Sequence, residues 1–208
     1  MVGDLALKDT DDAKEAAIVD AARRAFLARG FDAASMDYIA LSAGVSKRTV
    51  YNRFRSKEAL FAAAINESCR RLVPTDVEDI EAHLPPEEFI GRMARVIVRG
   101  IFSEESIALR RIATFEAGRN PALGRSFLEY GPRWLVRTCS ESIARMQSRG
   151  VLRAGDPEVA VWQLGSLITE PLHTEVLLGD PPPDLELALE RQIQRGLDAF
   201  FKLYDFKR

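Results

Sequence analysis

Between Gly44 and Lys57 the chain reads GVSKRTVYNRFRSK, a stretch with five basic side chains and no acidic one. If residues 46–54 form a helix, Val50 and Phe54 share one face, which packs inward, while Arg48 and Asn52 point to the opposite side. Arg, Lys and Asn side chains can hydrogen-bond base edges, and Thr, Tyr and Lys can bind phosphates. The stretch is therefore a candidate recognition helix for DNA.

The preceding residues supply the rest of a helix-turn-helix. Ser35 is a plausible N-cap for a short helix with Asp37 in its first turn, where the helix dipole favours a carboxylate. Gly44 permits a tight left-handed turn, and Val45 can fill the corner between the two helices. Two short helices joined by a glycine-containing turn are typical of a helix-turn-helix.

A longer helix is expected before this pair, from about Ala13 to Arg29, and Gly30 ends it. It has one apolar face, formed by Ile18, Ala21, Ala22, Ala25 and Phe26. A basic amphipathic stretch such as 44–57 can also be a solvated surface. Here the charge, the glycine turn, the caps and the apolar spacing coincide, which favours DNA binding.

Residues 18–61, IVDAARRAFLARGFDAASMDYIALSAGVSKRTVYNRFRSKEALF, resemble the N-terminal domain of the TetR family of regulators. The matching positions are Phe26, Gly30, Ser35, Ile39-Ala40, Ala43-Gly44-Val45-Ser46, Thr49-Val50-Tyr51, Phe54, Lys57 and Glu58-Ala59-Leu60. The resemblance implies a dimeric DNA-binding transcriptional regulator, usually a repressor, that responds to a small molecule.

The resemblance also implies roles for individual residues. Ser35, Tyr51 and Lys57 match phosphate contacts, and four further residues match positions that face bases or phosphates: Lys47, Arg48, Thr49 and Asn52. Asn52 and Arg53 differ from the aromatic or His residues of many members, so the base preference of a relative does not transfer.

The remainder of the chain is also expected to be helical. Candidate helices are 57–72, 86–102, 104–118, 121–149, 157–178 and 184–204, and Pro132 and Pro171 should each break or kink the helix that contains them. The fold class is thus all-α: a three-helix DNA-binding domain at 13–60 and a helical ligand-binding and dimerisation domain at 61–208. Composition changes near residues 73–85, around Pro74 and Pro85-Pro86.

Residues 108–179 are similar to the C-terminal domain of AefR-like TetR regulators, through Arg110-Arg111, Glu116, Asn120-Pro121, Phe127, Gly131-Pro132, Gly150 and Asp156-Pro157. Such domains bind an effector and dimerise. Candidate effector-binding residues are Phe115, Glu116, Phe127, Trp134, Trp162, Glu170 and His173, although aromatic residues of this kind are more often ordinary core. The polar candidates could face solvent or orient a ligand, and Glu170 and His173, three residues apart on one helix, could also pair with each other. Pro171 frees backbone groups that a ligand or water could satisfy.

An apolar stripe follows the last expected helix: Leu185, Leu189, Ile193, Leu197, Phe200 and Tyr204. It fits either the core or a dimer interface, and the sequence does not separate the two. A two-fold dimer through the last two helices is expected, because one short helix-turn-helix covers too little DNA for tight specific binding.

Composition excludes several other classes of protein. The 208 residues carry a net charge of −2, so any nucleic-acid binding must come from a local patch. Cys69 and Cys139 are expected to be reduced core thiols, and His83 and His173 lack metal-ligand spacing, so neither a metal nor a cofactor is expected. No phosphate loop, nucleophile elbow or zinc motif supports the rival interpretation as an enzyme, and the basic patch argues against a helical interaction module.

The chain also shows no signal-like or membrane-spanning segment. We therefore expect a cytoplasmic protein whose partners are operator DNA, a second copy of itself and a small-molecule effector.

Overall fold

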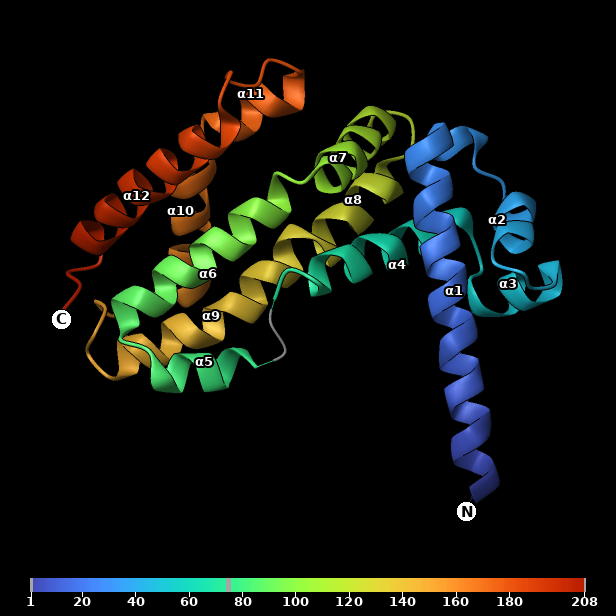
Figure 1. Cartoon of the computed structure of the whole chain (residues 1–208), viewed down its shortest axis with the longest axis horizontal. Coiled ribbons are helices and arrows are strands. Elements are labelled where there is room, and N and C mark those ends of the chain that lie inside the picture. The colour runs from blue at the N-terminus through green and yellow to red at the C-terminus, as the bar shows by residue number, and fades with distance from the viewer. Residues whose placement is uncertain (1, 74–75, 208) are drawn as a thin grey trace. The chain divides into compact units, whose positions relative to one another are not determined.

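The computed structural model describes residues 2–73 and 76–207, with side chains from residue 12 onward. These residues form twelve helices and no strand, which confirms the all-α prediction (Figure 1). In chain order the helices are α1 (Val2–Ala33), α2 (Met36–Ser42), α3 (Lys47–Arg53), α4 (Lys57–Arg70), α5 (Val77–His83), α6 (Pro86–Ile101), α7 (Glu104–Ala117), α8 (Pro121–Tyr130), α9 (Pro132–Ser148), α10 (Pro157–Thr169), α11 (Leu172–Leu178) and α12 (Leu185–Leu203).

The helices divide into two compact units. The first comprises the residues up to Arg70 together with Ala108–Gly131, and the second comprises Arg71–Ile107 together with the residues from Pro132 onward. The first unit therefore contains α1 to α4, most of α7, and α8. Residues 108–131 pack with the N-terminal helices, although more than thirty residues of sequence separate them from α4.

The first unit is built on the apolar face expected for α1. Ile18, Ala22 and Phe26 are fully buried there. Phe26 packs edge-on against Phe61 of α4, with ring centroids 5.2 Å apart, and Phe31 meets both rings at 5.7 Å. This aromatic cluster joins α1 to α4 and fixes the base on which α2 and α3 rest.

Helix α1 differs from its expected bounds. It begins at Val2 rather than near Ala13, and residues 4–17 contain neither proline nor glycine that would interrupt it. The helical backbone breaks at Gly30, whose φ of 75° lies in the left-handed region, as the sequence predicted.

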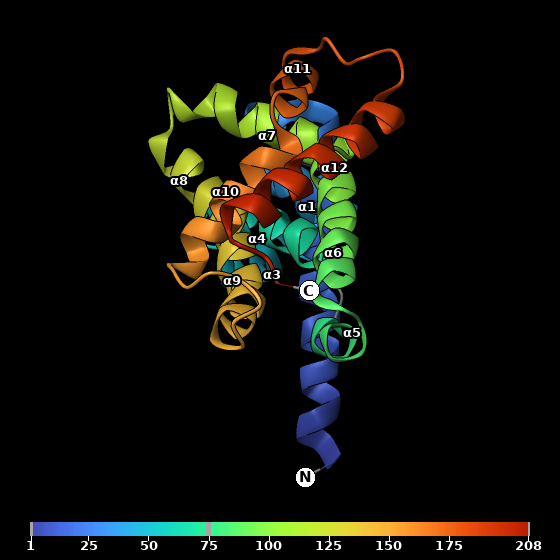
Figure 2. The ribbon, with the colours of Figure 1, turned by 90° about the vertical axis from the view of Figure 1, so that its left-hand side faces the viewer.

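The core of the second unit is made by α6, α9, α10 and α12. Helix α12 lies along α10 and α6 (Figures 1 and 2). Its apolar stripe belongs to this core within one chain, since five of its residues are at most 5% exposed: Leu189, Ile193, Leu197, Phe200 and Tyr204. The choice that the sequence left open between core and dimer interface thus falls on the core for these five residues.

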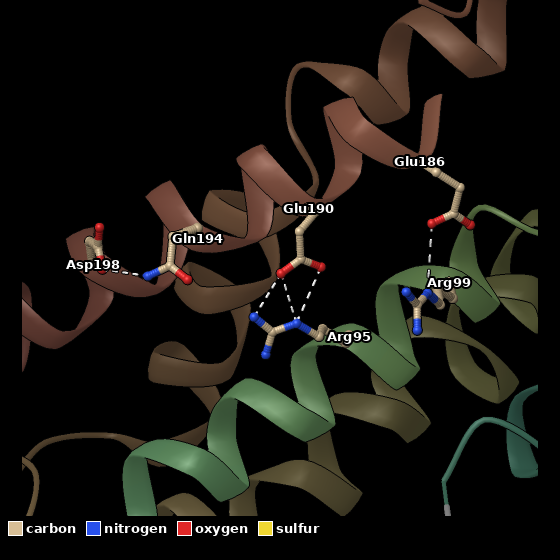
Figure 3. Close-up of polar contacts among 6 residues, drawn as sticks. All are labelled: Arg95, Arg99, Glu186, Glu190, Gln194 and Asp198. Atoms are coloured by element: carbon tan, nitrogen blue, oxygen red, sulfur yellow. Dashed lines mark hydrogen bonds and ion pairs between the residues drawn. The ribbon is translucent and has the colours of Figure 1, made fainter. Parts of the chain in front are cut away.

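Polar contacts bind α12 to α6 along the edge of this core (Figure 3). The guanidinium of Arg95 donates to both carboxylate oxygens of Glu190 at 2.7–3.2 Å, and this holds the pKa of the Glu190 carboxyl below its usual range. One helical turn away, Arg99 Nε lies 3.8 Å from Glu186 Oε2. The two pairs fix the register of α12 on α6.

Both internal prolines break their helices as predicted. Helix α8 ends at Tyr130 and α9 begins at Pro132, while α10 ends at Thr169 before Pro171. Because Pro171 has no N–H, the carbonyl of Leu167 lacks its usual helical donor, and the side-chain Nε2 of Gln192 in α12 donates to it at 2.7 Å. A side chain of the same fold thus satisfies this freed carbonyl without a ligand.

Helix α5 was not predicted from the sequence, where residues 73–85 are marked only by a change of composition. Val77, Ile80 and Leu84 recur at helical spacing and pack on the second core, and the Arg145 guanidinium donates to Glu81 at 2.6–3.2 Å. The expected break at Pro74 lies outside the described residues.

Candidate nucleic-acid interface

Helices α2 and α3 each begin at a serine whose hydroxyl caps the helix. Ser35 Oγ accepts a hydrogen bond from the backbone N–H of Tyr38 at 3.1 Å, and Ser46 Oγ accepts one from Thr49 at 3.0 Å. Each cap satisfies a backbone donor that the first turn leaves without a helical partner. The starts of both helices are therefore fixed locally, as the sequence predicted.

The turn between the two helices is closed by backbone hydrogen bonds around Gly44. Its φ is 68°, its N–H donates to the carbonyl of Leu41 at 3.2 Å, and the N–H of Val45 donates to Ala40 at 3.1 Å. This is the pattern of a Schellman motif, in which the left-handed residue is normally glycine. Val45 packs against the core beneath the turn, in the corner expected for it.

Helix α3 separates its apolar and polar residues onto opposite faces. Val50 is fully buried and the C-cap residue Phe54 is 8% exposed, so these two residues anchor the helix in the first core. Arg48, Tyr51 and Asn52 are exposed, and Thr49 is half-buried. The helix thus presents a row of donors to solvent from a position held by two apolar side chains.

Lys47 and Arg53, near the two ends of α3, form ion pairs with carboxylates of neighbouring helices. Lys47 donates to Asp37 of α2, and Arg53 Nη1 donates to Glu15 Oε2 of α1 at 3.1 Å. No local sequence pattern indicates either pair, because the partners are ten and thirty-eight residues away along the chain.

Lys57 has contacts that differ in kind from those expected of a phosphate ligand. Its Nζ donates to the backbone carbonyls of Phe31 at 2.7 Å and Asp32 at 3.1 Å, and it lies 4.4 Å from the centre of the Phe31 ring. These carbonyls follow the break at Gly30, near the last residue of α1. Lys57 therefore links the end of α1 to the start of α4.

An open groove of about 470 Å³ lies between α1 and α3. It is lined by Lys14 of α1 and by Thr49, Asn52 and Arg53 of α3. Lys14 is not among the predicted contacts, because nothing in the sequence around it distinguishes it from other helical lysines. The groove adds a cation from a second helix to the donor face of α3.

The residues expected to bind an effector are divided between the two units. Phe115, Glu116 and Phe127 lie in the first: Phe115 is 67% exposed beneath the Arg119 guanidinium, Glu116 is buried, and Phe127 is half-buried under Arg110. Trp134, Trp162, Glu170 and His173 lie in the second.

Within the second unit, one predicted pair is brought together. His173 is buried, its Nδ1 lies 3.5 Å from Glu170 Oε1, and its ring meets Phe102 edge-on at 5.7 Å. Trp162 is 46% exposed on α10, and Trp134 is half-buried on α9.

The described residues include two cysteines, and neither carries a reactive thiolate. Burial raises the pKa of both thiols, Cys69 and Cys139, to about 11, so both are protonated at neutral pH. Within residues 2–73 and 76–207, no group of three or more His, Cys, Asp or Glu side chains is arranged to hold a metal ion. No helix in that part of the chain combines the length and apolar character of a membrane span.

Two family models match the chain. Residues 18–64 match the model described as bacterial regulatory proteins of the tetR family, and residues 89–206 match the C-terminal domain of AefR-like transcriptional repressors. The first match covers the helix-turn-helix described above, and the second covers α6 to α12 apart from the start of α6.

Known proteins resemble the chain over nearly its full length. The HTH-type transcriptional regulator UidR of Escherichia coli (strain K12) is 35% identical over 185 residues, or 88% of each chain. Among solved structures, the flavonoid-responsive regulator FrrA is 37% identical with a TM-score of 0.72, covering 91% of this chain and 96% of its own. A TetR-family regulator from Mesorhizobium loti MAFF303099 is 28% identical with a TM-score of 0.78, covering 93% and 98%.

Proposed function

Because the chain belongs to the TetR family of DNA-binding transcriptional regulators, we propose that it is a homodimeric repressor that binds a palindromic operator through α3 and leaves it when a small, largely apolar ligand binds. The family and these relatives are regulators, not enzymes. The observation that carries the proposal is the donor face of α3, which is exposed while Val50 and Phe54 anchor the helix. A regulator of this kind acts in the cytoplasm, where bacterial DNA lies.

The proposed contacts with DNA follow from the two faces of the helix-turn-helix. Arg48 and Asn52 read base edges, because both are exposed on the same side of α3. Ser35, Thr49 and Tyr51 bind phosphates. Lys47 contacts DNA after exchanging Asp37 for a phosphate, and Lys57 has one N–H left for a phosphate beside its two carbonyl partners.

The proposed division of labour assigns DNA binding to residues 13–60 and ligand binding and dimerisation to residues 61–208. For the dimer we propose the outer face of α10, where Val159 and Trp162 are 47% and 46% exposed in the single chain. Two exposed apolar side chains on one turn of a helix favour a partner surface, and a second copy would cover them with the same residues.

We place the proposed ligand site within the second unit, where the aromatic ring of Trp134 favours a largely apolar ligand and Glu170 and His173 would orient it. The other candidates are not part of this site, since Phe115, Glu116 and Phe127 lie in the first unit and Trp162 belongs to the proposed dimer surface. The name of the relative FrrA, flavonoid-responsive, supports a planar aromatic compound. A ligand releases DNA only if it prefers the conformation that binds the operator less well.

The test begins by selecting bound sequences from a pool of random duplexes. The proposal predicts an enriched palindrome with half-sites about one turn apart, ~34–36 Å, or a multiple of it. A flavonoid panel is then added to the complex, with the small cation choline as control. Coupling of about 1–3 kcal/mol would lower operator affinity roughly 5–150-fold.

Two results would contradict the proposal at different points. A pool that shows no enrichment rejects sequence-specific DNA binding. If an operator is enriched but no apolar compound lowers the affinity for it more than choline does, the apolar ligand is rejected and the operator assignment stands.

A further inference from the structure

We propose that the groove between α1 and α3 is a binding site for one backbone phosphate of duplex DNA, in which Lys14 and Arg53 supply the positive charge and Glu15 holds Arg53 in the free protein. This inference rests on the proposed function, because it takes α3 to lie against DNA. It adds α1 to the elements that contact DNA, and it gives Glu15 a part in setting the affinity for duplex DNA.

The chemistry of the groove matches an anion. Its four lining residues are Lys14, Thr49, Asn52 and Arg53, and each of these side chains carries at least one hydrogen-bond donor. Two of them are cations at neutral pH, and no carboxylate is among the lining residues. A phosphate diester carries one negative charge and only acceptors, so every lining side chain can donate to it.

The position of the groove matches the edge of a DNA major groove. Asn52 and Arg53 lie three and four residues after Thr49, so the three residues share one side of α3. Asn52 also belongs to the exposed face proposed to read bases. Phosphates line both edges of the major groove, so a helix that reads bases from it has phosphates beside it, where α1 presents Lys14.

The ion pair between Glu15 and Arg53 gives the site a competing ligand. Glu15 Oε2 accepts from Arg53 Nη1 at 3.1 Å, and the Glu15 side chain is 53% exposed. A carboxylate and a phosphate offer a guanidinium the same kind of paired oxygens. The Arg53 side chain is 19% exposed, but the carboxylate end of the pair is open to solvent, which weakens its hold on Arg53, so a phosphate can displace Glu15. Removing the Glu15 charge should therefore strengthen binding to any duplex.

The first experiment measures the affinity of the full-length protein for a random-sequence duplex over a series of salt concentrations. Lys14→Ala should weaken binding to this duplex and to the selected operator by the same factor. It should also reduce the slope of log affinity against log salt by about one, the change expected for one lost phosphate contact. Lys202→Ala, which removes an exposed lysine from the end of α12, is the matched control and should leave the slope unchanged.

The second experiment isolates Glu15 with a double-mutant cycle. Glu15→Gln should raise affinity for the random duplex more than Asp12→Asn, which removes the same charge from α1 one turn earlier. In an Arg53→Ala background the advantage of Glu15→Gln over Asp12→Asn should disappear, because the side chain that Glu15 holds is gone.

The outcomes separate this inference from the proposed function. If the wild type binds duplexes with steep salt dependence while Lys14→Ala keeps its slope, the phosphate site is wrong and the proposed function stands. If Glu15→Gln and Asp12→Asn act alike in both backgrounds, Glu15 does not hold Arg53 against DNA. A wild type that binds no duplex overturns both proposals.

Discussion

At the scale of the residue, Lys57 has a structural role besides the phosphate contact proposed for it. Two of its three N–H groups donate to the carbonyls of Phe31 and Asp32, which follow the break in α1 at Gly30. Its ammonium also lies over the Phe31 ring, which belongs to the aromatic cluster beneath the helix-turn-helix. A residue that the sequence marks for DNA contact therefore also holds together the helices that support the contact.

Lys57→Ala should accordingly lower stability as well as DNA affinity. The loss of two charge-assisted hydrogen bonds predicts a decrease of about 1–3 kcal/mol in the free energy of unfolding, measured by urea titration. Arg55→Ala removes an exposed charge two residues earlier and should leave the unfolding free energy nearly unchanged. Equal stability of the two variants would show that Lys57 serves DNA binding alone.

At the scale of the element, the close approach of α10 and α12 depends on Gly196. A Cβ at this position would lie 2.5 Å from the carbonyl oxygen of Leu167, which already accepts a hydrogen bond from Gln192. Gly165 in α10 has no neighbour within 4 Å of the corresponding point. The two glycines thus differ in packing although both lie inside helices.

Gly196→Ala should force α12 away from α10 and cost about 1–3 kcal/mol of stability, since backbone atoms cannot move aside as a flexible side chain can. Gly165→Ala should instead gain up to about 1 kcal/mol from helix propensity. Thermal unfolding of the two variants measures the contrast. A stabilised Gly196→Ala variant would mean that the two helices are not packed this closely.

The ion pair between α5 and α9 predicts a dependence of stability on pH. Burial raises the pKa of the Glu81 carboxyl, but hydrogen bonds from Arg145 and Ser142 and the Arg145 charge outweigh it, so the pKa is lowered overall. The contribution to stability is therefore present above the unfolded pKa of about 4.3 and is lost as pH falls through the folded value. At pH 7, Glu81→Gln should lower the free energy of unfolding by about 1–2 kcal/mol, a modest amount because solvent screens the half-exposed Arg145. As pH falls, this variant should lose less stability than the wild type, because it has no carboxylate to protonate at this position. An unchanged acid transition in this variant would assign the effect to other carboxylates.

The sequence predicted most elements because their signals are local. Serine caps, the glycine turn and the two internal prolines fixed the ends of α2, α3, α8 and α10 to within about two residues. Helix α5 was missed because its seven residues carry four acidic or His side chains, and only Val77, Ile80 and Leu84 repeat at helical spacing. Its position depends on Glu81 meeting Arg145, sixty-four residues later.

For the candidate site, the sequence found the donors of α3 but not their partners. The amphipathic spacing of Val50 and Phe54 was enough to turn Arg48 and Asn52 outward. The partners are Asp37 for Lys47, Glu15 for Arg53, and two backbone carbonyls of α1 for Lys57. These contacts, and the place of Lys14 in the groove, form between helices, and no local pattern encodes them.

At the scale of the whole molecule, the dimer proposed through α10 can be tested by comparing a charge substitution at an exposed apolar position with one at a buried apolar position. Trp162→Glu places a charge on a half-exposed position and should give folded monomers, detected by sedimentation, with weak operator binding. Leu189→Glu places the same charge on a side chain that is 4% exposed in one chain, and should unfold the second unit. A folded Trp162→Glu variant that remains dimeric would move the interface away from α10.

The most direct test of DNA recognition by α3 is the affinity of wild type and Arg48→Ala for the selected operator and for a random duplex, measured over a series of salt concentrations. We predict steep salt dependence on both duplexes and a clear preference of the wild type for the operator. Arg48→Ala should lose about 1–3 kcal/mol on the operator, a larger loss than on the random duplex, because a base contact disappears. Equal losses on the two duplexes, or affinities that do not change with salt, would contradict the assignment of α3 as the helix that reads DNA.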